Sequence, residues 1–154
     1  MVVINFASSG LSVEKLAYAF FEVNDNYDPP LLDRIQQKSN NLTLFDYIKK
    51  LVTHGNIYIC VIDENIAGVI GVYTNDLINS SAHIPILFVT DQFKGRGIAS
   101  RLLVVACDHA IKQNMKTIQV NTWQKNNAAR KLYGKFSFKT ISSAGNNLTL
   151  IKQL

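Results

Sequence analysis

The sequence predicts a mixed α/β domain in which a sheet carries helices on both faces. Two apolar runs are joined by Asp63-Glu64-Asn65, a turn that indicates an antiparallel hairpin. Strand and helix patterns then alternate along the chain, as they do in α/β proteins. The 154 residues are 47% hydrophobic and 18% charged, which is sufficient for a core without disulfides or a metal. We therefore expect a single domain over residues 1–154.

The N-terminal third predicts a strand followed by two capped helices. Ser12 and Thr43 are favoured helix N-caps, and each precedes apolar residues at helical spacing. Gly55 ends the second helix. The expected elements are a strand over residues 2–6, a helix over residues 13–23, a polar loop over residues 24–30 and a helix between Thr43 and Gly55.

The remainder of the chain predicts further strands and two more helices. Strands are expected over residues 57–62, 66–73, 82–90, 117–122, 136–141 and 148–154, and helices over residues 97–114 and 127–135. Pro85 interrupts the third of these strands. Because proline has no N–H to donate to a ladder, it indicates either a bulge or an edge strand at this point.

Several classes of protein are disfavoured by composition. Cys60 and Cys107 lie far apart among apolar residues, which favours buried thiols. The three histidines, His54, His83 and His109, have no ligand-like spacing, so we expect no metal site. There is no secretion-signal pattern and no apolar run of membrane-spanning length. We expect a cytoplasmic protein with no membrane partner.

Positive charge is concentrated in the C-terminal half. Between Lys94 and Lys139 ten Lys and Arg residues face a single acid, Asp108. This asymmetry indicates an anionic partner, either nucleic acid or a small polyphosphate ligand. The nucleic-acid hypothesis lacks an aromatic-basic RNA motif or a DNA-reading helix, and salt-sensitive DNA retention would support it.

The most informative stretch joins a buried strand ending at Val89 to a long helix through Gly95 and Gly97. Glycines allow successive backbone N–H groups to converge, and the helix N-terminus adds unpaired donors and a positive dipole end. These features predict a pyrophosphate-binding loop, with positive charge supplied nearby by Lys94, Arg96 and Arg101. The alternative is a plain strand-to-helix turn that uses glycine for its geometry. The loop is not a Walker loop, because Gly-Lys-Ser/Thr is absent.

Two motifs resemble the GNAT superfamily of N-acetyltransferases. Residues 94–99 (KGRGIA), five positions after Val89, resemble the family's phosphate-loop signature, and residues 126–138 (NNAARKLYGKFSF) resemble its second motif. Lys94 and Ser137 depart from the usual Arg or Gln and the usual Gly. The resemblance covers roughly residues 57–141 and implies a twisted, mostly antiparallel sheet of six to seven strands. In that fold a central strand pair splays apart.

The resemblance also implies acetyl-CoA as acyl donor. It places the backbone of Phe88 and Val89 and the side chain of Asn126 against the pantetheine arm. It gives Tyr133 the role of proton donor to the coenzyme A thiolate, and the Val89 amide that of facing the thioester oxygen. The base is either His83, whose ordinary pKa is near neutral, or a water relay. The implied cofactor-binding residues are Phe88, Val89, Lys94, Gly95, Arg96, Gly97, Ile98, Ala99, Ser100, Asn126, Ala129, Lys131 and Tyr133.

The acceptor is less defined. Acids before residue 34 are candidates for holding an ammonium group, although exposed helix faces explain them as well; they are Glu14, Glu22, Asp25, Asp28 and Asp33. Tyr27, Tyr73 and Trp123 are candidates for shaping the pocket, and packing is the simpler explanation for each. We expect a small-molecule amine acceptor and a monomer or homodimer. The alternatives are acetylation of a protein N-terminus or lysine, and a catalytically silent acetyl-CoA-binding module.

Overall fold

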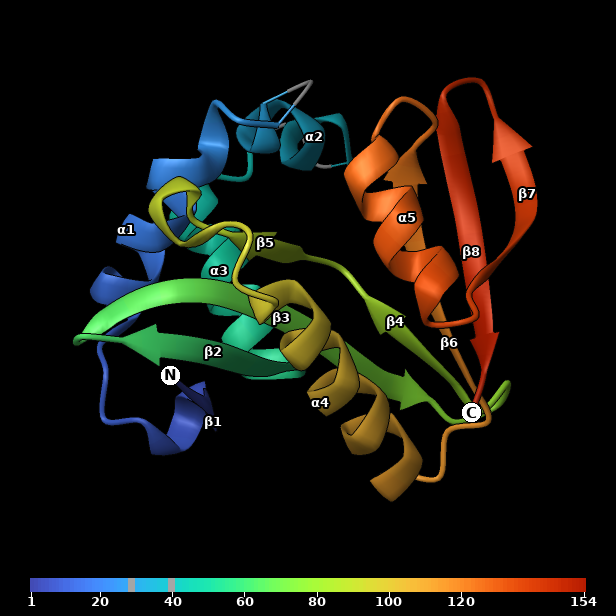
Figure 1. Cartoon of the computed structure of the whole chain (residues 1–154), viewed down its shortest axis with the longest axis horizontal. Helices are drawn as coiled ribbons and strands as arrows, with labels where there is room; N and C mark the ends of the chain where they lie inside the picture. Colours follow the sequence, from blue (N-terminus) through green and yellow to red (C-terminus); the bar gives the residue numbers. More distant parts are fainter. Residues whose placement is uncertain (28–29, 39–40) are drawn as a thin grey trace.

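A computed structural model describes residues 1–27, 30–38 and 41–154, and it shows a sheet between two layers of helices (Figure 1). The elements in order are β1 (Val2–Asn5), η1 (Phe6–Ser8), α1 (Val13–Asn24), α2 (Leu31–Lys38), α3 (Leu44–His54), β2 (Asn56–Ile62), β3 (Asn65–Asp76), β4 (Ser81–Ile84), β5 (Leu87–Val89), η2 (Asp91–Phe93), α4 (Ile98–Lys112), β6 (Thr117–Trp123), α5 (Asn127–Lys135), β7 (Lys139–Ala144) and β8 (Asn147–Gln153).

Within the described residues, eight strands form one mostly antiparallel sheet. Its order is β1-β2-β3-β4-β6-β8-β7, and β5 pairs with β3 beside β4. The β4–β6 pair is parallel, whereas the other pairs are antiparallel. The predicted mixed α/β fold is therefore confirmed.

The strand predicted over residues 82–90 is in fact two short strands. β4 pairs with both β3 and β6, but after Pro85 and Ile86 the chain continues as β5, which among the described strands pairs with β3 only. The sheet is therefore splayed between β5 and the far half of β6. Pro85 lies at the interruption between β4 and β5, where it has no ladder hydrogen bond to donate.

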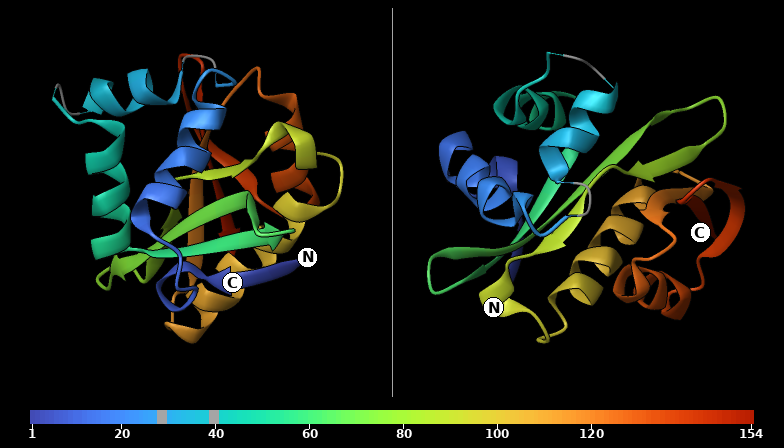
Figure 2. Two further views of the ribbon diagram at one scale, coloured as in Figure 1. Left: turned by 90° about the vertical axis from the view of Figure 1, so that its left-hand side faces the viewer. Right: turned by 90° about the horizontal axis from the view of Figure 1, so that it is seen from above.

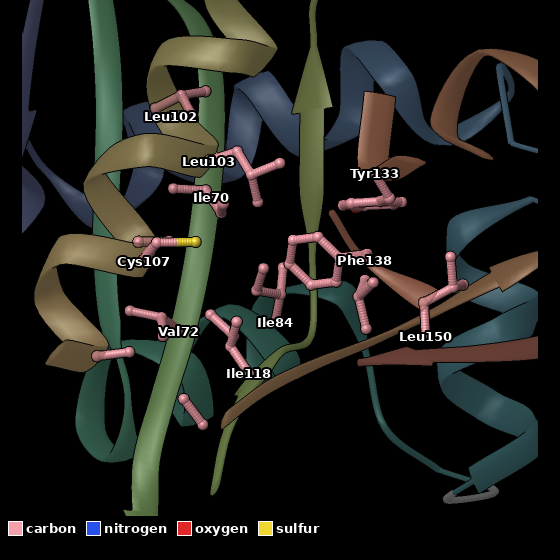
Figure 3. Close-up of a cluster of buried hydrophobic side chains, with 14 of the residues drawn as sticks. Ile70, Val72, Ile84, Leu102, Leu103, Cys107, Ile118, Tyr133, Phe138 and Leu150 are labelled. Carbon is pink, nitrogen blue, oxygen red and sulfur yellow. The ribbon is translucent and has the colours of Figure 1, made fainter. Parts of the chain in front are cut away.

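Each face of the sheet has its own apolar core. Helices α1, α2 and α3 cover one face and bury Phe20, Ile48 and Leu51 against β2, β3 and β5. Helices α4 and α5 cover the other, as the view from above in Figure 2 shows. That second core contains Leu102, Leu103 and both cysteines as buried free thiols, as predicted (Figure 3).

Three sequence predictions need correction. Helix α2 was not predicted, although Pro30 directly before it is a common helix-start signal and Leu31 and Ile35 are buried one turn apart. The strand predicted over residues 136–141 begins only at Lys139, because residues 136–138 terminate α5. Phe6 belongs to η1 and not to the first strand.

The predicted helix caps are confirmed. The Ser12 hydroxyl accepts a hydrogen bond from the Lys15 amide at 3.1 Å. Thr43 and Asp46 form a reciprocal capping box at the start of α3. No helix in the described residues is both long and apolar enough to cross a membrane.

Helix α4 packs closely on β3 at Gly68. A methyl group on this residue would lie 2.9 Å from Ile98 Cγ2, 3.0 Å from Leu102 Cδ1 and 3.1 Å from the Phe88 carbonyl oxygen. We expect Gly68→Ala to lower the free energy of unfolding by about 1–3 kcal/mol through overpacking, measured by urea denaturation.

Gly134→Ala is the matched control for this substitution. Gly134 lies in α5, and nothing lies within 4 Å of the added methyl. The control should be neutral or stabilise the fold by up to about 1 kcal/mol, because alanine is the better helix former. Equal destabilisation by both variants would show that the α4–β3 approach is not tight.

Candidate active site

The splay leaves one side of β5 open to a ligand. The Ile86 carbonyl accepts a hydrogen bond from β3, and the Thr90 amide donates one to β3, both at 3.0 Å. Because backbone groups alternate in direction along a strand, Leu87 and Val89 point their N–H and C=O groups away from β3. Pairing of β6 with β4 ends at Val120, so these groups face the gap between the strands.

The resemblance implies that both Phe88 and Val89 offer backbone groups to pantetheine, but the same alternation points their backbone groups in opposite directions. Val89 directs its amide and carbonyl into the gap. Phe88 pairs with Val69 of β3, so its backbone is used within the sheet and is not available to a ligand. Phe88 instead lines the site beside Val89.

The loop before α4 forms an anion cradle. Gly95 and Gly97 have φ values of 78° and 75°, in the left-handed region that glycine adopts without strain. Gly97 is the N-cap of α4 and provides no capping side chain. In the described part of the chain, nothing accepts a hydrogen bond from the N–H groups of residues 95–100. These amides at a helix N-terminus are suited to bind phosphate.

The charges around the cradle are partly engaged with one another. Lys94 Nζ lies 2.5 Å from Asp91 Oδ1, and Asp91 also accepts a hydrogen bond from Asn26 at 2.9 Å. The Lys94 hydrogen bond is the main reason why the pKa of the Asp91 carboxyl is lowered. Arg96 lies over the Phe93 ring at 5.1 Å. Since Lys94 is paired in this way, the backbone amides are the groups of the loop best placed to bind an anion.

A cavity of about 380 Å³ runs from this cradle between β5, α4 and α5. It is lined by Leu87, Phe88, Val89, Phe93, Lys94, Gly95, Gly97, Ile98, Ala99, Ser100, Ala128, Ala129, Leu132 and Tyr133. Most of the cofactor-binding residues implied by resemblance are therefore brought together. The sequence reasoning missed Leu87, Phe93, Ala128 and Leu132, which adjoin motif residues and have no polar group to signal a role.

Four implied site residues do not line the cavity. Arg96 and Lys131 are exposed. Asn126 is the N-cap of α5, and its side-chain oxygen accepts a hydrogen bond from the Ala129 amide at 3.1 Å. His83 lies in β4 opposite Tyr73 of β3, and strand alternation places it on the face opposite Ala82 and Ile84.

Tyr133 reaches the cavity from α5. The side chain is buried, and its ring packs against Phe138 at a centroid distance of 5.3 Å (Figure 3). No group in the described residues forms a hydrogen bond with its hydroxyl. Burial raises the pKa of Tyr133, so the phenol stays protonated at neutral pH and is available as a donor.

The end of α5 fixes the position of Tyr133. The Phe138 amide donates to the Tyr133 carbonyl at 3.0 Å, and the Ser137 amide donates to the Gly134 carbonyl at 3.1 Å. This is a Schellman motif, and its hydrophobic contact is the Tyr133–Phe138 pair. Ser137 has φ 67°, so it occupies the left-handed position where the family motif has glycine.

We therefore expect Ser137→Gly to raise the free energy of unfolding by about 1 kcal/mol, because serine is strained at a left-handed φ. Thermal and urea denaturation would measure the gain. Ser143→Gly, in the exposed strand β7, is the control and should destabilise slightly. A loss of stability in Ser137→Gly would show that serine makes a compensating interaction at this position.

The opposite side of the gap is aromatic. The Tyr27 hydroxyl donates to the Leu87 carbonyl at 3.0 Å, which ties the end of α1 to β5. The rings of Phe20 and Phe88 meet edge to face at 4.9 Å. The acids considered for the acceptor are exposed where they are described, namely Glu14, Glu22, Asp25 and Asp33. Asp28 lies outside the described residues.

A splayed sheet, a glycine loop at a helix N-terminus and a buried tyrosine thus meet at one cavity. The chain belongs to the acetyltransferase (GNAT) family, whose sequence profile matches residues 17–138. Membership of this family implies acyltransferase activity. No curated protein sequence matches the chain significantly.

Solved acetyltransferases have the same fold over nearly the whole chain. A GNAT acetyltransferase from Staphylococcus aureus Mu50 has a TM-score of 0.77 at 20% identity, covering 99% of this chain and 98% of its own. The PaiA N-acetyltransferase from Thermoplasma acidophilum, in complex with coenzyme A, scores 0.73 at 17% identity with 100% of both chains covered. A GNAT acetyltransferase from Elizabethkingia anophelis with acetyl-CoA bound scores 0.71 at 16% identity, covering 99% and 97%.

In the described residues, no cluster of three or more His, Cys, Asp or Glu side chains is arranged to hold a metal ion. The cavity lining likewise contains none of these four residue types.

Proposed function

We propose that this protein is an acetyl-CoA-dependent N-acetyltransferase that acetylates the primary amine of a small molecule. The observation that carries the proposal is that the anion cradle and Tyr133 open into the same cavity. A polyphosphate ligand held at residues 95–100 would extend a long arm along β5 and reach the tyrosine.

The residues present fit coenzyme A. The amides of the cradle would hold its pyrophosphate, and Val89 would pair with the amide-bearing arm as a neighbouring strand does. Ile98, Ala129 and Leu132 provide apolar walls for that arm. The acyl donor supplies a thioester, which is activated toward attack by an amine.

Two groups of this chain would assist the transfer. The Val89 amide, directed into the gap, would stabilise the negative charge that develops on the thioester oxygen. Tyr133 would donate a hydrogen bond to the departing sulfur. Because the pKa of Tyr133 is raised by burial, its role is to stabilise the thiolate through this bond and not to act as a strong acid.

The proton of the attacking amine would leave through His83 or through water. His83 lies on the sheet face covered by α1–α3, the side from which we expect the acceptor to approach. Since it does not line the cavity of the acyl donor, a relay through water is compatible with its position. A modest loss of activity in His83→Ala would be compatible with either route.

The contacts on the acceptor side favour a small molecule over a protein substrate. Tyr27 and Trp123 come from opposite sides of the splay. The guanidinium carbon of Arg34 lies 5.1 Å from the Tyr27 ring centroid and 5.0 Å from the Trp123 ring centroid, so this side chain lies close to both rings. We expect this contact to narrow the approach to the gap. A lysine or N-terminus on a folded protein would need a more open groove.

Thermal unfolding with excess acetyl-CoA tests the proposal, with ADP and duplex DNA as controls. Acetyl-CoA at 100 times its Kd should stabilise the fold by about 2.7 kcal/mol, whereas the controls should not. An amine screen by thiol release would follow. A shift without thiol release from any amine would identify a silent binding module, and a shift with DNA alone would favour a nucleic-acid partner.

A further inference from the structure

A second tyrosine hydroxyl lies beside the open edge of β5. Tyr27, which follows α1, donates a hydrogen bond to the Leu87 carbonyl at 3.0 Å. That carbonyl points away from β3 and into the gap, and Leu87 lines the cavity together with Val89 and Tyr133. The Tyr27 oxygen therefore lies at the edge of the same gap, on the side covered by α1–α3.

The direction of this hydrogen bond decides what the hydroxyl can offer to a ligand. A carbonyl oxygen accepts and does not donate, so the single proton of the Tyr27 hydroxyl is directed to Leu87. Among the described residues, this is the hydrogen bond that the hydroxyl makes. Its oxygen retains lone pairs, and donation to the carbonyl polarises it toward accepting. Tyr27 thus offers an acceptor to the gap, whereas Tyr133 offers a donor.

Tyr27 is fixed before any ligand arrives. The neighbouring Asn26 donates from its side chain to Asp91 at 2.9 Å, so both residues tie the end of α1 to the segment that contains β5 and η2. Burial raises the pKa of Tyr27, and the nearby Tyr133 raises it further. The phenol is therefore neutral at pH 7, and the two hydroxyls lie within electrostatic reach of each other.

The spacing along β5 suits attack by an amine at this position. Two residues of a strand span about 7 Å, which separates the level of Leu87 from that of Val89. A thioester oxygen bound by the Val89 amide would lie about 3 Å from that nitrogen. The attacking nitrogen would lie about 3 Å beyond the thioester carbon, which brings it to the level of Leu87 and the Tyr27 oxygen.

We propose that the Tyr27 oxygen accepts a hydrogen bond from one N–H of the acceptor amine and so directs the nitrogen lone pair at the thioester carbon. This inference rests on the proposed acetyltransferase function. In the transfer the N–C bond forms, and the C–S bond breaks with its electron pair on sulfur. The proton of the second N–H leaves by the route through His83 or water. Tyr27 keeps its own proton, which stays on the hydrogen bond to Leu87.

This arrangement distinguishes primary amines from their N-methyl derivatives. A neutral primary amine has one N–H for Tyr27 and a second that supplies the departing proton. An N-methyl amine has a single N–H, which cannot serve both purposes at once. The site should therefore prefer the primary amine, and part of that preference should depend on the Tyr27 oxygen.

Matched pairs of amines test the proposal by thiol release from acetyl-CoA. The pairs are phenethylamine with N-methylphenethylamine, and ethanolamine with N-methylethanolamine. The wild type should prefer the primary amine of a pair by about tenfold or more in kcat/KM. Tyr27→Phe should lower this ratio by about threefold to tenfold, the factor for one neutral hydrogen bond. If Tyr27 only held β5 in place, both amines would slow equally and the ratio would not change.

Tyr47→Phe is the matched control. Tyr47 lies on the same face of the sheet and packs edge to face on the Phe20 ring at 6.4 Å. In the part of the chain that the structure describes, nothing is hydrogen-bonded to its hydroxyl. The substitution removes the same oxygen atom as Tyr27→Phe, and its ratio should equal that of the wild type.

The outcomes separate this inference from the proposed function. An acetyl-CoA melting shift that persists in Tyr27→Phe shows that the variant is folded and binds the acyl donor. The inference would be overturned by an unchanged ratio in Tyr27→Phe, by an equal fall in Tyr47→Phe, or by a wild type that acetylates primary and N-methyl amines equally or acetylates none of the four. Absence of the acetyl-CoA shift in the wild type would instead overturn the proposed function.

Discussion

Replacing Tyr133 with phenylalanine is expected to lower kcat by about tenfold to a hundredfold, the range for loss of a hydrogen bond to a charged group. The KM for acetyl-CoA should change little, since the ring and its packing against Phe138 are retained. Steady-state thiol release with a responsive amine measures both constants. Because burial raises the pKa of Tyr133, its ionisation should not limit the wild-type rate below about pH 10.

Tyr58→Phe is the matched control for this result. The Tyr58 hydroxyl is hydrogen-bonded to His109 Nδ1 at 2.9 Å, in the β2–α4 interface, and Tyr58 does not line the cavity. Losing this hydroxyl should leave kcat close to that of the wild type. A Tyr133→Phe enzyme with full activity would exclude the tyrosine as the donor to sulfur and would favour water in that role.

Replacing Gly97 with alanine is expected to weaken acetyl-CoA binding by about tenfold to a hundredfold. Gly97 has φ 75° at the N-cap of α4, and an alanine would shift the backbone toward negative φ and turn the cradle amides away. One lost charge-assisted hydrogen bond costs about 1.5–3 kcal/mol, which corresponds to this loss in affinity. Titration of the variant with coenzyme A by calorimetry measures the effect.

Gly145→Ala is the control for backbone strain, because it introduces alanine at a left-handed φ outside the proposed phosphate-binding loop. Gly145 has φ 61° in the β7–β8 turn, and, as at Gly97, nothing lies within 4 Å of an added methyl. Both variants should lose similar stability, about 1–2 kcal/mol, but only Gly97→Ala should lose affinity. Equal affinity in the two variants would mean that the phosphates are bound elsewhere.

Much of the acyl-donor site could be predicted because it is encoded locally. The cradle is formed by successive residues, so Gly95, Gly97 and the start of α4 carry the signal in one short stretch. The second motif is equally compact. The structure explains why its glycine position tolerates serine, since the Schellman hydrogen bonds of Ser137 use only backbone atoms.

Other features were outside the reach of local pattern. Helix α2 is short, and its buried Leu31 and Ile35 give a weak periodic signal. Pro85 indicated a bulge or an edge strand, and a single strand was expected over residues 82–90, so its division into β4 and β5 was not predicted. The neighbouring strands decide this division. On the side away from β3, β4 pairs with β6, whereas β5 has no partner strand among the described residues.

The residues alone thus predicted the class of fold, which the structure confirms, together with the glycine loop before α4 and the motif containing Tyr133, because hydrophobic period, caps and glycine turns act over a few neighbouring positions. Only the tertiary structure decided the contacts on the side of the gap from which we expect the acceptor to approach. There Tyr27 meets Leu87 across 60 residues, and Arg34 meets Trp123 from the other half of the chain. Contacts of this kind depend on how α1, α2 and the splayed strands pack together, and no local pattern specifies that packing.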